Sequence, residues 1–149
     1  MRRIQNAIFV RLIWATWDRL PLLVTAIERD VHRAIEAKRK ELGTEIIAFG
    51  GVEDHVHLPV RLPATLTVAD LVKHLKGVSS HLLTQRLHPY DFFKWQGAYA
   101  AYSVSVDHLD RVSHYIAHQR EHHANNTFVP DWEIPLGPRN ERGGEEKPA

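Results

Sequence analysis

Two histidines that stand two residues apart, His55 and His57, are the first side chains in the sequence whose spacing could do chemistry. Alternate residues of a β-strand point to the same face, so a strand over His55–Arg61 would place both imidazoles together and its apolar residues on the opposite face. Two neighbouring imidazoles can bind a divalent metal ion or one phosphate group. Such pairs also occur by chance on a solvated sheet face, and the spacing alone leaves both interpretations open.

A tyrosine and a glutamine lie one helical turn apart in the segment 107–123, whose apolar residues recur at the spacing of an amphipathic helix. In one continuous helix Tyr115, Gln119 and His122 would form a line along the surface, which Arg111 extends by one turn. A tyrosine in this setting is commonly a core aromatic whose hydroxyl reaches the edge of the core. The histidine-rich end is equally consistent with a solvated helix terminus, where imidazolium groups complement the helix dipole.

A basic stretch lies in the middle of the chain. Residues 61–96 contain five Lys and Arg against two Asp and Glu, a local charge of +3 in a chain whose net charge is +1. The stretch includes Lys73, Lys76, Arg86 and Lys94. Phosphate binding is one interpretation, and a solvated helix face is the other. The neighbouring aromatic residues could stack unpaired bases or serve as core or dimer contacts; they are Tyr90, Phe92, Phe93 and Trp95.

The periodicity of the chain predicts four strands and three helices that would position these side chains. The strands are expected at 7–16, 45–52, 55–61 and 99–106, and the helices at 24–42, 68–86 and 107–123. The order β-α-β-β-α-β-α is typical of an α+β, ferredoxin-like fold with an additional C-terminal helix, which here carries Tyr115. We expect a four-stranded antiparallel sheet with helices on one face, in a single domain over residues 1–135 with a flexible tail at 136–149.

Candidate caps mark the ends of these helices. Gly43 is predicted to end the first helix, and the segment 65–67 to cap the start of the second. Asp107 is the predicted N-cap of the third helix, with Asp110 three residues later as in a capping box.

The composition excludes several classes of protein. The 149 residues include 19 Lys and Arg, 18 Asp and Glu, 11 His and no Cys, so disulfides, thiolate zinc sites and cysteine nucleophiles are absent. No apolar run approaches the roughly 20 residues of a membrane span, and the first six residues lack the apolar segment of a signal peptide. We expect a cytoplasmic protein with no membrane partner.

Several motifs in a fixed order resemble one family. Over roughly residues 7 to 130 the sequence resembles the single-tyrosine transposases of the HUH class, which include the small insertion-sequence transposases and the REP-associated tyrosine transposases. The motifs are Trp14-Ala15-Thr16 with Arg19-Leu20-Pro21, His55-Val56-His57-Leu58, Leu75-Lys76-Gly77-Val78-Ser79-Ser80, the segment 95–105 and the segment 112–123. One departure is Pro59, where the family commonly has an aliphatic residue. Because proline cannot donate to the ladder, we expect this strand to be interrupted or at an edge.

The resemblance implies roles for particular residues. By position, His55 and His57 are the metal-binding pair, Gln119 is the third protein ligand and Tyr115 is the nucleophile. Two imidazoles and an amide oxygen suit Mg or Mn, and zinc also fits this donor set. The implied reaction cleaves single-stranded DNA through a 5′-phosphotyrosine intermediate and later rejoins it. The residues expected to contact DNA are Lys73, Lys76, Arg86, Lys94, Arg111 and Arg120.

The resemblance also implies partners and leaves alternatives. The substrate is expected to be single-stranded DNA with hairpin or palindromic ends, bound by a homodimer in which the strand at 99–106 is a candidate contact. Whether the tyrosine serves its own histidine pair or that of the other subunit stays open. Two other functions are compatible with the residues: a domesticated DNA-binding protein without mobility, and a metal-dependent phosphoesterase that uses water while Tyr115 orients the substrate.

Overall fold

A five-stranded antiparallel sheet forms the centre of the computed structural model, which describes residues 5–86 and 92–125 apart from the side chains of Arg86 and His123. The strands are β1 (Phe9–Ala15), β2 (Glu45–Ile46), β3 (Gly50–Val52), β4 (His55–Arg61) and β5 (Ala100–Val104). The helices are α1 (Thr25–Leu42), α2 (Val68–Arg86), α3 (Val106–Ala117) and α4 (Gln119–Ala124), with a short 3-10 turn η1 (Trp17–Arg19) after β1. The predicted α+β fold is confirmed, and the predicted tail at 136–149 lies outside the described residues.

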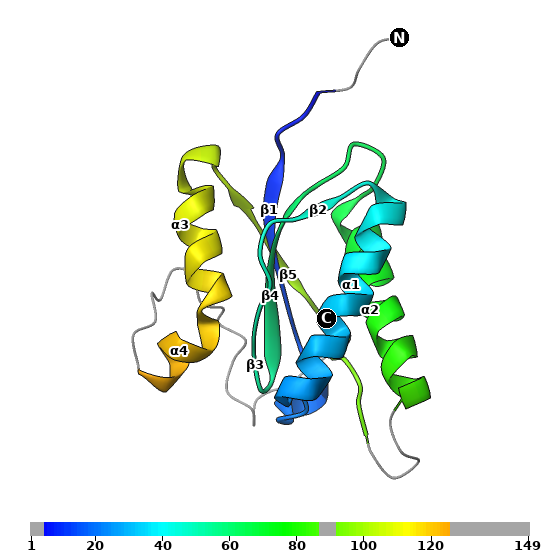
Figure 1. Ribbon diagram of the computed structural model, residues 1–149. Helices are drawn as coiled ribbons and strands as arrows, with labels where there is room; N and C mark the ends of the chain where they lie inside the picture. The colour runs from blue at the N-terminus through cyan, green and yellow to red at the C-terminus, as the bar shows by residue number, and fades with distance from the viewer. Residues whose placement is uncertain (1–4, 87–91, 126–149) are drawn as a thin grey trace, which may run out of the picture.

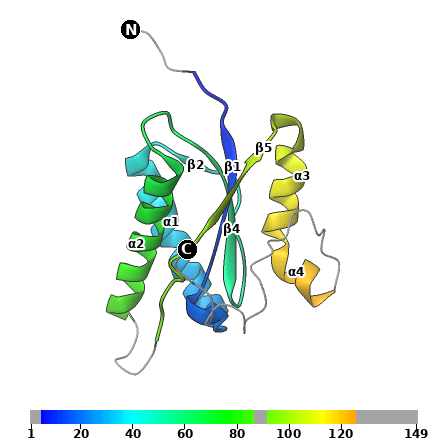
Figure 2. The same ribbon diagram turned by 180° about the vertical axis from the view of Figure 1, so that it is seen from behind.

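The sheet has helices on both faces, whereas the sequence predicted helices on one face. Figures 1 and 2 show α1 and α2 on one side of the strands and α3 and α4 on the other. Alternate residues of β4 explain the two layers: Val56, Leu58 and Val60 join the core beneath α1 and α2, so the odd-numbered residues face α3. A smaller core on this second face consists of Val112, Tyr115 and Ile116 packed on Ala48 and Val104.

Strand β4 lies inside the sheet, between β1 on one side and β2 and β3 on the other. The Pro59 carbonyl accepts a hydrogen bond from the Ile47 amide (2.9 Å), so the proline nitrogen also faces the β2–β3 side. The pairings of β2 and β3 with β4 differ in register by one residue, which is the signature of a bulge. The missing N–H of Pro59 therefore falls where the ladder is broken. The predicted interruption is confirmed, and an edge position for this strand is wrong.

The predicted strand at 45–52 is divided by this bulge into β2 and β3, which is why the sheet has five strands where four were expected. Two predicted caps are confirmed. Gly43 ends α1 with φ 70°, and the Thr67 hydroxyl accepts a hydrogen bond from the Asp70 amide (3.1 Å) at the start of α2. The prediction for α3 is wrong by two residues: Ser105 is the N-cap, and Asp107 lies in the first turn.

The helix predicted at 107–123 is broken at His118. This residue has φ −109° and ψ 26°, and its amide donates to the Tyr115 carbonyl (3.2 Å), which closes the last turn of α3. The six residues after it form α4, which packs on β3. The single line of Tyr115, Gln119 and His122 on one helix is therefore wrong, because tertiary packing bends the chain between the first two.

None of the helices in the described ranges is both long enough and apolar enough to cross a membrane.

Candidate active site

The two histidines of β4 lie buried side by side beneath α3. Their ring centroids are 4.9 Å apart with the planes at 66°, and only 4% of His55 and none of His57 is exposed. The predicted shared face is confirmed, and the alternative of a solvated face is wrong because α3 covers it. Burial of two imidazoles is costly unless other groups satisfy their nitrogens. A rigid strand in the middle of a sheet holds such a pair in a constant geometry, as metal ligation requires.

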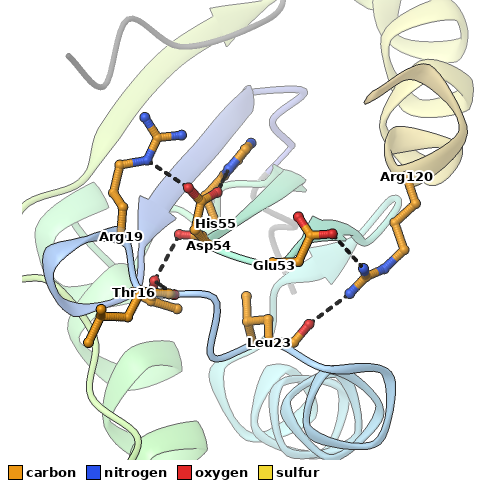
Figure 3. A network of polar contacts seen from close by, with 8 residues as sticks. Thr16, Arg19, Leu23, Glu53, Asp54, His55 and Arg120 are labelled. Carbon is orange, nitrogen blue, oxygen red and sulfur yellow. Dashed lines mark hydrogen bonds and ion pairs between the residues drawn. The ribbon is translucent and has the colours of Figure 1, made fainter. Parts of the chain in front are cut away.

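A carboxylate fixes the orientation of the first imidazole. Asp54 Oδ1 lies 2.7 Å from His55 Nδ1, and Arg19 Nε lies 3.0 Å from Asp54 Oδ2 (Figure 3). A carboxylate accepts hydrogen bonds, so Nδ1 is the donor nitrogen of this pair and Nε2 is the nitrogen that a metal ion would take. This carboxylate–histidine arrangement orients many metal-bound imidazoles.

Asp54 is suited to remain ionised in this position. Burial alone would raise the pKa of its carboxyl, but the hydrogen bond and charge of His55, together with the Arg19 guanidinium, hold the pKa below its ordinary value. Sequence reasoning gave Asp54 no role in the site. A signal was present, since an acidic residue immediately precedes the first histidine.

Helix α3 approaches the histidine pair at a glycine. Gly50 of β3 is the register partner of His57, and a Cβ at Gly50 would lie 1.9 Å from the Ile116 carbonyl oxygen. Only glycine allows the backbones of β3 and α3 to come this close. The residue next to Ile116 is Tyr115, so the close approach brings the tyrosine's part of α3 over the histidines.

The tyrosine ring is held between the sheet and α4. Tyr115 is 4% exposed and its ring stacks on that of His122, with centroids 4.2 Å apart and the planes at 18°. The two rings were expected on one helix surface, and the bend at His118 brings them together from two helices. The same two rings line a shallow depression with Asp110, Arg111 and His114, so the tyrosine is reached from the surface near exposed Arg111.

Gln119 lies at the start of α4 and is 1% exposed. It lines a small cavity with Gly50 and Gly51, the residues of β3 that pair with His57 and Val56. In residues 5–86 and 92–125 there is no group of three His, Cys, Asp or Glu side chains that could hold a metal ion. The amide oxygen of Gln119, which lines the same cavity as the register partner of His57, is a donor that suits a divalent metal ion.

The six predicted DNA contacts have different surroundings. Lys73 and Arg111 are exposed, and the Lys94 ammonium lies 4.1 Å from the centroid of the Trp17 ring. Lys76 donates to the carbonyls of Gln96 and Ala98, and its partial burial lowers the pKa of its ammonium. The Arg86 side chain lies outside the described residues.

Arg120 anchors α4 to the rest of the chain. Its Nε donates to Glu28 Oε2 (2.8 Å). Figure 3 shows its other two contacts: Nη2 donates to the Leu23 carbonyl (2.8 Å), and Nη1 lies 4.0 Å from Glu53 Oε1. These contacts join three segments distant in sequence. The guanidinium therefore stabilises the position of α4, and its contact with DNA stays a prediction.

The aromatic connector before β5 belongs partly to the core. Trp95 is 6% exposed, donates its Nε1–H to Ser79 Oγ (3.0 Å) and meets Trp14 edge to face at 5.8 Å. Phe93 packs against Trp95 at 4.8 Å. For these two residues the structure favours the core interpretation over base stacking. Phe92 is 53% exposed, and Tyr90 lies outside the described residues.

Comparison with known protein families identifies the class to which this α+β chain with its buried histidine pair belongs, the transposases. The family model described as "Transposase IS200 like" matches residues 5–119, well over half of the chain. The chain belongs to the IS200-like transposase family, and the predicted resemblance is confirmed at that level.

Two solved structures share the fold. A Deinococcus radiodurans R1 protein assigned as a transposase has 23% sequence identity and a TM-score of 0.60, with 87% of this chain and 98% of that one covered. A REP-associated tyrosine transposase bound to a REP hairpin has 14% identity and a TM-score of 0.61, with 93% of this chain and 94% of that one covered. A comparison of the sequence with curated proteins gives no significant match.

Proposed function

We propose that this chain is a transposase that cleaves and rejoins single-stranded DNA at hairpin-flanked ends, through a 5′-phosphotyrosine intermediate and with a divalent metal ion. The observation that carries the proposal is the buried His55–His57 pair beneath the helix that presents Tyr115. Two adjacent imidazoles, one of them oriented by a carboxylate, are a donor set typical of a metal-dependent enzyme.

The metal ligands in this proposal are His55, His57 and Gln119. Asp54 contacts Nδ1 of His55, so Nε2 is the nitrogen that would coordinate the ion, and Gln119 would contribute an amide oxygen from the start of α4. When bound, Mg or Mn would withdraw charge from the scissile phosphate. The neutral ligands leave that positive charge undiminished, since neither imidazole nor amide carries a negative charge.

Tyr115 supplies the nucleophile. Its phenol oxygen forms a bond to phosphorus while the bond from phosphorus to the 3′ oxygen breaks. The phenol loses one proton and the departing 3′ oxygen gains one, so the products are a 5′-phosphotyrosine and a 3′-hydroxyl. Attack of a 3′-hydroxyl on the phosphotyrosine reverses these steps and rejoins DNA without another energy source. Stacking on His122 restrains the ring before the attack.

The proposed substrate is DNA with a hairpin end. Support comes from the shared fold with a transposase whose structure contains a REP hairpin. Exposed Arg111 beside Tyr115 and exposed Lys73 on α2 are the basic side chains best suited to contact phosphates.

A homodimer is the proposed assembly. Strand β5 lies at the edge of the sheet, and Tyr102 on it is 43% exposed. An exposed edge strand can pair with a second chain. A molar mass of one chain by light scattering, both with and without DNA, would contradict the dimer.

Covalent capture tests the cleavage reaction. The protein is incubated with Mn and a DNA hairpin labelled at its 3′ end, on the part of the strand that a 5′-phosphotyrosine retains, then denatured and separated by electrophoresis. The label should stay on the wild-type protein and be lost in Tyr115→Phe. Cleavage that persists in Tyr115→Phe would favour a phosphoesterase that uses water. DNA binding without cleavage in either protein would favour a domesticated binding protein.

A further inference from the structure

An exposed tryptophan lies next to the proposed active site, outside both hydrophobic cores. Trp17 begins the turn η1 after β1 and is 42% exposed, although most other large apolar side chains of this region are buried. Exposure of so large an apolar surface is unfavourable in water unless a ligand covers it.

The backbone around Trp17 is held rigidly. Its amide donates to the Lys94 carbonyl (2.8 Å), and the next amide, that of Asp18, donates to Gln96 Oε1 (3.1 Å). Asp18 and Arg19 have φ values of 50° and 49°, a left-handed conformation that residues other than glycine avoid. Consecutive strained residues persist only where the surroundings enforce them, and such strain is concentrated at ligand-binding sites.

The turn is joined directly to the histidine site. The Thr16 amide donates to the Asp54 carbonyl (2.9 Å), and Arg19 pairs with the Asp54 carboxylate that orients His55 (Figure 3). Thr16 and Asp54 are hydrogen-bonded neighbours on adjacent segments; Trp17 directly follows Thr16 in the chain, and His55 directly follows Asp54. The Cα atoms of Trp17 and His55 are therefore no more than about 13 Å apart, a span that a few nucleotides can bridge.

A cation completes the surface. The Lys94 ammonium lies 4.1 Å from the centroid of the Trp17 ring, so an aromatic face and a positive charge are presented together. Proteins that hold single-stranded nucleic acid combine these two features, with the ring stacking on a base and the cation meeting a phosphate.

We propose that Trp17 and Lys94 form a binding site for one unpaired nucleobase of the DNA strand that runs through the active site. The inference rests on the proposed function for the identity of its ligand. Trp17 stacks on the base, and Lys94 neutralises the adjoining phosphate. Because every base has a π face, the site is tolerant of sequence and distinguishes unpaired from paired DNA.

Equilibrium binding to two DNA hairpins tests the site. One hairpin carries a single-stranded extension and the other ends flush, and all proteins carry Tyr115→Phe to prevent cleavage. Trp17→Ala should weaken binding of the extended hairpin about 5- to 100-fold and leave the flush hairpin unchanged. Trp17→Phe should recover part of the loss. Lys94→Ala should reduce the slope of the logarithm of the binding constant against the logarithm of the salt concentration by about one.

Phe92→Ala is the matched control, since Phe92 is also an exposed aromatic of this region at 53% exposure. Its affinity should equal that of the parent protein. A loss in Phe92→Ala that equals or exceeds the loss in Trp17→Ala would overturn the assignment. Melting temperatures should agree among these variants, because neither side chain belongs to a core cluster.

A fluorescent base gives a second measurement. 2-Aminopurine in the extension should be quenched by the parent protein and by Phe92→Ala but not by Trp17→Ala. If the wild type forms the covalent DNA adduct and Trp17→Ala still quenches the base, the binding site is wrong and the proposed function stands. If Trp17 controls binding while no adduct forms, the cleavage mechanism is wrong and the binding site stands.

Discussion

At the scale of single residues, the chemistry of the site depends on how each imidazole is oriented. His55 is oriented by Asp54, which is itself held by Arg19, so three side chains from two segments define one ligand position. His57 has no exposed surface and owes its environment to the strands on either side and to α3 above it. The metal affinity of the pair is therefore expected to depend on Asp54 as well as on the histidines.

Asp54→Asn is expected to weaken Mn binding about 10- to 100-fold, because a neutral amide no longer selects the Nδ1–H tautomer of His55. Calorimetry measures the affinity, and nitrogen NMR of labelled histidine reads the tautomer in the metal-free protein. His57→Ala should abolish metal-dependent cleavage and keep the fold, as judged by circular dichroism. Unchanged Mn affinity in both variants would contradict the metal site.

At the scale of secondary-structure elements, the site depends on how closely α3 lies on the sheet. The approach occurs at Gly50, where a side chain would overlap the Ile116 carbonyl. The bend at His118 then turns α4 towards β3, and Arg120 fastens it to α1 through Glu28. Tyr115 and Gln119 thus lie on separate helices.

Gly50→Ala should destabilise the protein by about 1–3 kcal/mol and reduce cleavage, because the added methyl group displaces α3 from the sheet. Urea denaturation measures the free energy of unfolding. Gly77→Ala in α2 is the matched control, since its Cβ would meet no atom within 4 Å. That change should stabilise the protein by about 0.5–1 kcal/mol, as replacement of a helical glycine does. Equal effects of the two changes would contradict the close approach.

Substitutions of Arg120 and Arg111 are expected to have different effects, because Arg120 is proposed to stabilise the fold and Arg111 to contact DNA. Arg120→Gln should lower the free energy of unfolding by roughly 0.5–1.5 kcal/mol, because α4 loses its hydrogen bonds to Glu28 and Leu23. Arg111→Gln should leave the free energy of unfolding unchanged. It should reduce the slope of log binding constant against log salt concentration for DNA by about one. The reverse pattern, with Arg120→Gln changing only the salt dependence, would assign the DNA contact to Arg120.

At the scale of the whole molecule, the two faces of the sheet differ: one carries the main hydrophobic core and the other the candidate site. Helices α1 and α2 lie on one face of the sheet and α3 on the other (Figure 1). The main hydrophobic core lies on the first face, and the buried histidines of β4 lie on the second. The tyrosine helix in this arrangement packs on the sheet of its own chain. A tyrosine and a histidine pair from the same chain are therefore expected to work together.

A mixing experiment tests this arrangement. Tyr115→Phe and His57→Ala proteins are each expected to be inactive, and their mixture should stay inactive because neither chain has a complete site. The formation of the covalent DNA adduct in the mixture is the measurement. Restored adduct formation would show that the tyrosine of one subunit serves the histidines of the other, and would require α3 to leave the position it has here.

The sequence by itself determined the elements and the types of chemical group. Alternation in His55–Arg61 places the two histidines on one face, and the apolar spacing predicts α1 and α2 close to their observed ends, because both patterns are local. Gly43 and Thr67 act as predicted for the same reason. The order of the sequence motifs was also enough to identify the family, because motif order is read from the sequence without knowledge of tertiary contacts.

Only the tertiary structure decided how these elements meet. Three features depend on residues far apart in the chain. They are the burial of the histidines by α3, the packing of α4 on β3 after the bend at His118, and the pairing of Arg120 with Glu28. The contact of Arg19 with Asp54 and that of Lys94 with Trp17 likewise join separate segments, and no local pattern encodes them. Such contacts depend on the summed packing of the whole chain, because each helix has more than one face that could be buried and the sheet selects among them.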